Sequence, residues 1–139
     1  MLQIGDIVHL KPFKDTPYTI TGVMRAPGCA CEIVKDPENV DRVIYQIPYI
    51  NIYAVNGGEH SWVKEDIIPT GDHDPYPPSR YAIGDEVTIG SNSDIRHHIV
   101  AIEYARGEYT YTLAPTSGNQ ALIKRNEQDL IPATQYSLF

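Results

Sequence analysis

The sequence is poor in cysteine, in basic residues and in long apolar runs. Its 139 residues include two cysteines, and 11 basic residues stand against 18 acidic ones. Two cysteines cannot form the multiple disulfides of a small secreted domain. No stretch approaches the roughly 20 apolar residues that cross a bilayer, and the N-terminus lacks the basic and apolar segments of a signal peptide. We therefore expect a protein without membrane segments that is made in the cytoplasm of the producing cell and acts there, or in a virus particle assembled there.

The charge balance argues against general nucleic-acid binding. The net charge is −7. Residues 1–70 have nine acidic against six basic residues, and residues 81–139 have seven against four. Binding to a phosphate backbone would therefore lack its usual electrostatic driving force. An acidic surface favours solubility and a basic protein partner.

The strongest positive feature is an internal repeat. Residues 4–23 match residues 83–102 at a constant offset of 79 positions, and each copy begins with Ile-Gly-Asp. A second match closes each copy, since Glu65-Asp-Ile-Ile-Pro69 is similar to Gln128-Asp-Leu-Ile-Pro132. Internal repetition outranks other sequence signals of fold. We therefore expect two small units in tandem, residues 1–70 and 81–139, which pack together because each alone would bury little surface.

Strand signals dominate both copies. β-Branched and aromatic residues gather at 6–10, 18–23, 50–55 and 61–63 in the first copy, and at 86–89, 98–103, 109–113 and 121–124 in the second. Asn56-Gly57-Gly58 predicts a hairpin turn, because Asn and Gly tolerate positive φ. No 11-residue window has helical periodicity, and single helical turns are expected near 64–66 and 126–129. The predicted class is all-β.

The two copies differ in length by an insertion. Asp6 to Asp66 spans 60 residues and Asp85 to Asp129 spans 44, so the first copy holds 16 more. The extra residues fall after the gap-free match, at about 25–48, where two strand-like runs flank a turn and predict an inserted β-hairpin. Residues 71–80 contain three prolines and predict a semi-rigid linker between the units.

The order of elements in each copy resembles the small SH3-like barrel, the fold group that includes KOW and Tudor-type modules. The resemblance is carried by Ile4-Gly-Asp-Ile-Val8 with Glu65-Asp-Ile-Ile-Pro69, and by Ile83-Gly-Asp-Glu-Val87 with Gln128-Asp-Leu-Ile-Pro132. It covers most of both units and implies two tandem SH3-like barrels, the first with the inserted hairpin. Compact acidic tandem barrels of this kind are similar to accessory proteins encoded by bacterial viruses.

The repeated acidic residues are expected to be structural. Asp6 and Asp85 each follow a glycine, which favours a turn in which the carboxylate accepts backbone N–H groups. Asp66 and Asp129 are expected to cap the short turns before the closing strands. The sequence also lacks a Gly-rich phosphate loop, a G-x-S-x-G motif and an H-E-x-x-H motif. We therefore expect no catalytic residues and no enzyme activity.

No metal or cofactor site is predicted. Cys29 and Cys31 are one residue apart, but no further Cys or His pair supplies the other ligands that structural zinc requires. Asp72-His73-Asp74 combines suitable ligand types, and on a linker such a triplet is expected to be solvated. Whether that triplet binds a metal is left open.

Ten tyrosines and one tryptophan supply the candidates for contact with a partner. Tyr and Trp dominate protein interfaces because they bury a large area while keeping one polar atom satisfied. The alternative is that individual rings fill barrel cores or form cross-strand pairs. The predicted partner-binding residues are Tyr45, Tyr49, Tyr53, Trp62, Tyr104, Tyr109 and Tyr111.

The predicted function is non-enzymatic protein binding or assembly. The first hypothesis is a virus-encoded virion component of the decoration or connector type, or an accessory protein, with a capsid, tail or host protein as partner; a homo-oligomer is also open. One alternative is an inhibitor of a host defence protein. Another is a KOW-like nucleic-acid-binding module, which the net charge opposes. That module would use the basic residues Lys11, Lys14, Arg25, Lys124 and Arg125.

Overall fold

The computed structural model describes residues 2–27, 32–36, 39–46, 49–90, 95–116 and 122–133, without the side chains of residues 27–49. Strands make up 64% of the structure and helices 7%, which confirms the predicted all-β class. The first unit holds β1 (Asp6–Leu10), β2 (Phe13–Pro27), β3 (Glu32–Asp36), β4 (Asn39–Gln46), β5 (Tyr49–Val55), β6 (Ser61–Val63) and β7 (Ile67–His73). The second unit holds β8 (Glu86–Ile89), β9 (Arg96–Ala105), β10 (Glu108–Pro115), β11 (Ile123–Asn126) and β12 (Leu130–Pro132).

The two units repeat one strand order. In the first unit the hydrogen-bonded neighbours run β7-β1-β2-β5-β6. In the second they run β12-β8-β9-β10-β11. A single 3₁₀ turn precedes the closing strand in each unit, η1 (Lys64–Asp66) before β7 and η2 (Glu127–Asp129) before β12. Both turns lie where the sequence predicts them.

The opening turns of the units match down to single hydrogen bonds. The Gly5 N–H donates to the Ile20 carbonyl at 2.8 Å, and the Gly84 N–H donates to the Ile99 carbonyl at 2.8 Å. Both glycines have φ near the left-handed region, +97° for Gly5 and +93° for Gly84. A side chain is disfavoured at such angles. This requirement explains why Ile-Gly-Asp opens both copies.

The aspartates that follow these glycines close the turns, as predicted. The Asp6 Oδ2 accepts the Gln3 N–H at 2.9 Å, and the Asp85 Oδ2 accepts the Ala82 N–H at 2.9 Å. Each carboxylate therefore takes up a backbone donor three residues earlier in the chain.

The prediction that Asp66 and Asp129 cap the 3₁₀ turns is wrong. Neither turn has a side-chain cap hydrogen bond. These residues act through the main chain instead, because the Asp66 carbonyl accepts the Lys11 N–H at 3.0 Å and the Asp129 carbonyl accepts the Gly90 N–H at 3.1 Å. Each 3₁₀ turn is thereby tied to the residue that follows the opening strand of its unit.

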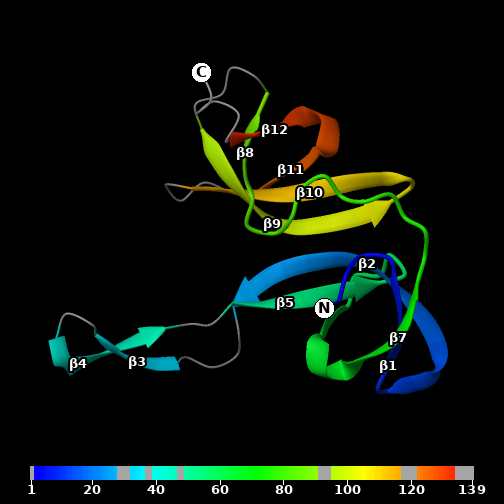
Figure 1. Cartoon of the computed structure of the whole chain (residues 1–139), viewed down its shortest axis with the longest axis horizontal. Coiled ribbons are helices and arrows are strands. Elements are labelled where there is room, and N and C mark those ends of the chain that lie inside the picture. The colour runs from blue at the N-terminus through cyan, green and yellow to red at the C-terminus, as the bar shows by residue number, and fades with distance from the viewer. Residues whose placement is uncertain are drawn as a thin grey trace.

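The units are joined edge to edge through β2 and β9, which makes one ten-stranded sheet. Figure 1 shows the two units one above the other, with β2 and β9 facing across the boundary. We call this boundary the seam. Three residue pairs form it: Gly22–Glu103, Val23–Ile102 and Met24–Ala101. The described strands do not close into barrels by hydrogen bonding, and the sheet runs continuously through both units.

The seam has the register of a local two-fold axis. At the repeat offset of 79 positions, Gly22 corresponds to Ala101 and Met24 to Glu103. Exchanging the units therefore maps the outer two pairs of the seam onto each other and the central pair, Val23–Ile102, onto itself. A symmetric pairing of this kind is the form that two identical copies adopt when they dimerise.

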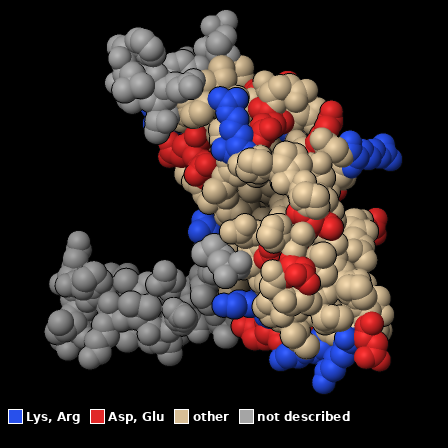
Figure 2. Space-filling model, turned by 45° about the vertical axis from the view of Figure 1, so that its right-hand side comes forward, with Lys and Arg blue, Asp and Glu red and all other residues tan. Residues whose placement is uncertain are grey.

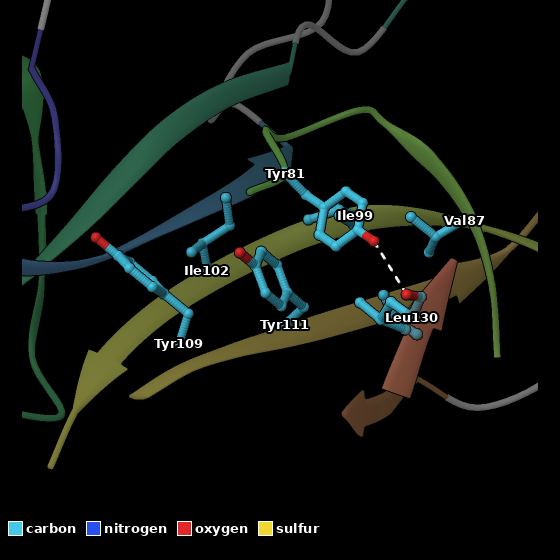
Figure 3. Packing of buried hydrophobic residues seen from close by; sticks show 8 residues of the cluster. Tyr81, Val87, Ile99, Ile102, Tyr109, Tyr111 and Leu130 are labelled. Atoms are coloured by element: carbon cyan, nitrogen blue, oxygen red, sulfur yellow. Dashed lines mark hydrogen bonds between the residues drawn. The ribbon is translucent and has the colours of Figure 1, made fainter. Parts of the chain in front are cut away.

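Each unit keeps its own apolar core. The first cluster holds Val8, Leu10, Ile20, Tyr53, Val55 and Ile67. The second holds Tyr81, Val87, Ile99, Ile102, Tyr109, Tyr111, Leu113 and Leu130 (Figure 3). Ile4 and Val23 pack against both clusters. These two side chains connect the cores across the seam, as expected for units that need each other to bury enough surface.

The boundary between strand and linker differs from the prediction of a linker at 71–80. Strand β7 continues to His73 because Asp6 pairs with His73 across β1 and β7. The Asp74 N–H then donates to the Gly5 carbonyl at 2.7 Å. The first three residues of the predicted linker therefore belong to the sheet.

Candidate functional site

The structure places the predicted aromatic residues in three different environments. The rings of Tyr53, Tyr109 and Tyr111 are buried, with exposed fractions of 5%, 7% and 0%. Trp62 and Tyr104 are half-buried. The side chains of Tyr45 and Tyr49 lie outside the described residues. The three buried tyrosines therefore have a packing role, and partner contact by the remaining four stays a prediction.

A period-two pattern distinguishes these buried tyrosines. In β10 the residues Tyr109, Tyr111 and Leu113 are buried, while Thr110 and Thr112 between them are half-buried. Alternation of this kind predicts a strand with one face on the core. This alternation is visible in the sequence alone, so Tyr109 and Tyr111 could have been assigned to the core before the structure was known.

Tyrosines of the linker and the second unit form a continuous series of ring contacts. The series includes two residues missed by sequence reasoning, Tyr76 and Tyr81. Ring centroids are 4.4 Å apart for Tyr76 and Tyr104, and 4.7 Å apart for Tyr104 and Tyr109. The series continues from Tyr109 to Tyr111 at 6.5 Å and from Tyr111 to Tyr81 at 5.4 Å. Tilted and edge-on aromatic pairs at these separations are stabilising.

Hydroxyl groups in this series fix the linker to the second unit. The Tyr109 hydroxyl donates to the Pro77 carbonyl at 2.5 Å. The Tyr111 hydroxyl lies 2.6 Å from Ser79 Oγ and donates to Glu127 Oε1 at 2.7 Å. The same Glu127 oxygen accepts the Arg80 N–H at 2.7 Å. The last part of the linker, from Pro77 to Arg80, is therefore bound by side chains of β10 and η2.

Burial sets the ionisation of Tyr111. Desolvation raises the pKa of its phenol to about 12; the hydrogen bond with Ser79 opposes this rise, and the hydrogen bond and charge of Glu127 add to it. Burial likewise raises the pKa of Tyr109 and of Tyr81. These phenols are accordingly neutral hydrogen-bond donors at physiological pH, with no sign of an activated nucleophile.

A groove lies between the units on the side where the linker passes, and we call it the linker-side groove. The volume of the groove is about 740 Å³, within the usual range for ligand sites. Its apolar lining contains two pairs of repeat-equivalent residues, Ile4 with Ile83 and Val23 with Ile102. Further lining comes from Leu2, Gln3, Asp6, Asn51, His73, Asp74, Tyr76, Pro77, Pro78, Ser79, Tyr81, Ala82 and Tyr109.

The opposite face of the seam carries a second hollow of about 460 Å³. Small residues line it where the units meet, namely Gly22, Ala54 and Ala101. A Cβ added at Gly22 would lie 3.4 Å from the Ala54 Cβ.

The hairpin β3–β4 forms a separate two-stranded sheet within the range predicted for an insertion. We call it the arm. Figure 1 shows it extending sideways from the end of the β2–β5 pair. The last described pair at its base joins Pro27 to Tyr49, and the first pair of the arm joins Glu32 to Gln46. Along the chain the arm therefore follows the outer end of the β2–β5 ladder, and it forms a sheet of its own.

The histidine and acidic triplet does not assemble a metal centre among the described residues. Asp72 and His73 belong to β7, and Asp74 follows it. The described part of the chain contains no group of three or more His, Cys, Asp or Glu residues placed to hold a metal ion. Cys29 and Cys31 lie outside the described residues.

Among the described residues, no helix is long and apolar enough to cross a membrane. No protein-family model, curated protein or solved structure matches the sequence or the fold.

Proposed function

We propose that this chain is a non-enzymatic protein-binding protein, built from two tandem SH3-like units and using the arm of the first unit as its main contact with a partner. The single observation that carries the proposal is that the arm pairs only with itself among the described strands. The identical strand order of the units, with a 3₁₀ turn before each closing strand, supports the SH3-like assignment.

The arm has little to stabilise it on its own. An isolated two-stranded hairpin is marginally stable at best in water. In the arm Ile33 pairs with Tyr45 and Val34 with Ile44. Successive rungs of a two-stranded ladder belong to opposite faces, so apolar residues occupy rungs of both faces. Such a ribbon gains stability when a second protein covers it.

The edges of the arm offer a second means of recognition. Strand β4 has eight residues, which at about 3.3 Å per residue gives an edge of about 26 Å. Unpaired strand edges readily accept a strand from another chain. We infer that a partner binds the arm through main-chain hydrogen bonds along this edge together with contacts to its apolar rungs.

As the biological setting we propose a virus-encoded virion component or accessory protein, an assignment supported by the resemblance in size and style to accessory proteins of bacterial viruses. Native mass measurement distinguishes the two main forms. A virion component is expected to multimerise or to attach to capsid or tail protein. An inhibitor of host defence is expected to remain a monomer of 15.6 kDa that binds one host protein.

Basic side chains are scattered on the face that Figure 2 shows. This distribution favours a protein partner over a phosphate backbone, which requires a basic patch or stripe. Retention of the chain on DNA or RNA that weakens steeply with salt would contradict the proposal.

The test compares capture of proteins from the producing cells by three forms of the chain. The first is the full chain. The second replaces residues 28–48 by Asn-Gly, which joins the paired residues Pro27 and Tyr49 through a two-residue hairpin turn. The third carries Val34→Thr with Ile44→Thr, which keeps β-propensity but removes an apolar rung.

A matched control is Ile68→Thr, since Ile68 is 37% exposed on β7, outside the arm. We expect the full chain and the Ile68→Thr form to retain one partner that both arm variants lose. Far-UV circular dichroism would confirm that all four forms are folded. Equal capture by all four forms would show that the arm is not the binding element.

A further inference from the structure

The linker-side groove is chemically unequal at its two ends. The first unit contributes Asp6, His73 and Asp74 to its lining, whereas the second unit contributes Tyr81, Ala82 and Ile83 there. Among the described residues, no lysine or arginine lines this groove. Arg25 lies near the opposite end, where its Nη1 is 3.9 Å from the place that a Cβ on Gly84 would take. The groove is therefore acidic at the end formed by the first unit.

The two carboxylates at that end are held in place and are not neutralised. The Gln3 N–H donates to the Asp6 Oδ2, and the Thr19 hydroxyl donates to the Asp74 Oδ2, both at 2.9 Å. Neither aspartate forms a salt bridge with another described residue. The salt bridge found among the described residues joins Arg96 to Glu86. Their negative charge is available to a ligand.

An aromatic ring stands beside this charge. Tyr76 lines the groove, and its ring packs within 3.4 Å of the position of a Cβ on Gly5. Contact with Tyr104 at 4.4 Å between centroids fixes the ring plane. The charge of Asp74 adds to the effect of burial in raising the pKa of Tyr76. An aromatic face next to a carboxylate favours a planar cation with an apolar stem.

We propose that the linker-side groove binds an arginine side chain presented by an extended segment of a protein partner. The guanidinium would lie at the Asp6 and Asp74 end against the ring of Tyr76. Flanking apolar residues of the segment would cover Ile4, Val23 and the equivalent residues of the second unit. This surface is separate from the arm, so the inference holds or fails independently of the arm.

The binding segment is represented in the test by the capped peptide acetyl-Val-Arg-Val-amide. Its control is the same peptide with citrulline in place of arginine, which keeps shape and hydrogen-bonding length but has no charge. Each peptide is titrated into the full ¹⁵N-labelled chain, and amide chemical shifts are followed by NMR. We expect the shifts to gather at the amides of Gly5, Asp74 and Tyr76.

The arginine peptide should bind about fivefold more tightly than the citrulline peptide, as expected for a charge pair near the surface. Asp6→Asn combined with Asp74→Asn should abolish that difference, because asparagine still accepts the local hydrogen bonds but carries no charge. Glu59→Gln removes an equal charge beside the hollow on the opposite face and should leave the difference unchanged. Raising the salt concentration should weaken only the arginine peptide.

Equal binding of the two peptides would overturn the proposal. Shifts centred on Gly22, Ala54 and Ala101 would also overturn it, because they would place the peptide in the opposite hollow. The same conclusion would follow if no shift occurred up to the solubility limit of the arginine peptide. The comparison of peptides needs no variant, so it remains decisive if the double asparagine form fails to fold.

Discussion

Replacing Tyr111 by phenylalanine should destabilise the second unit through one hydroxyl group. That hydroxyl contacts Ser79 Oγ and Glu127 Oε1, and Ser79 Oγ also donates to the Tyr81 carbonyl at 2.7 Å. The hydroxyl groups of Tyr111 and Ser79 thus have two hydrogens for three contacts. In the Tyr111→Phe variant, Ser79 keeps its hydrogen bond to the Tyr81 carbonyl. The net loss is one hydrogen bond to a carboxylate, and such bonds contribute about 1.5–3 kcal/mol.

The half-buried Glu127 can recover part of that loss. Its Oε1 still accepts the Arg80 N–H, and water can reach the carboxylate. We therefore expect a decrease of about 2 kcal/mol in the free energy of unfolding, or about 6–8 °C in Tm for a chain of this length. Urea unfolding followed by far-UV circular dichroism measures it, with an unchanged m value.

Tyr53→Phe is the matched control. Tyr53 pairs with Val23 as Tyr111 pairs with the repeat-equivalent Ile102, and Tyr53 is 5% exposed. Its hydroxyl forms no hydrogen bond with another described residue, so the change should stay within about 0.5 kcal/mol. A double-mutant cycle of Tyr111→Phe with Glu127→Gln should give a coupling above about 1 kcal/mol. Equal losses for the two phenylalanine variants, or no coupling, would refute this reasoning.

Three further predictions concern pH, the opening turns and the seam. In the folded protein the pKa of Tyr111 is raised from 10.0 to about 12. The contribution of this phenol to stability is therefore complete below pH 10 and is lost as the pH rises through 12. Thermal unfolding across this range should show a smaller loss of stability in Tyr111→Phe than in the parent. Gly5→Ala should cost more stability than Gly84→Ala in urea unfolding. Both substitutions strain a positive φ, but the new Cβ at Gly5 also lies 3.3 Å from a backbone oxygen. An equal cost of the two substitutions would exclude this contact as a cause. Met24→Cys with Ala101→Cys, with the native cysteines replaced by serine, should form a disulfide across the seam under mild oxidation, and failure to form one within the monomer would contradict the register.

Local features of the fold were predictable because their causes lie within a few residues. Gly5 and Gly84 require positive φ, and Asn56 adopts φ +51° in the predicted turn. The repeat placed the closing strands and both 3₁₀ turns correctly. The insertion was located by comparing the lengths of the copies. Each of these inferences needed only spacing and residue type.

The seam could not be predicted in the same way. Pairing between β2 and β9 joins residues 77 to 81 positions apart, and any two exposed strand edges of similar sequence could pair. Two tandem barrels packed against each other were therefore the expectation, whereas a continuous open sheet is observed. The linker-side groove depends on this pairing, so the sequence does not predict it. For this reason Asp6 was assigned only to a turn and Asp74 only to the linker.

The central claim is that the arm is the element that a partner protein covers. Hydrogen–deuterium exchange of the captured complex, compared with the free chain, tests it most directly. In the free chain each arm strand has one neighbour, so amides of β3 and β4 should exchange faster than those of β9 and β10, and partner binding should slow exchange in β3 and β4 most. Unchanged exchange in the arm, with protection confined to the body of the molecule, would contradict the account.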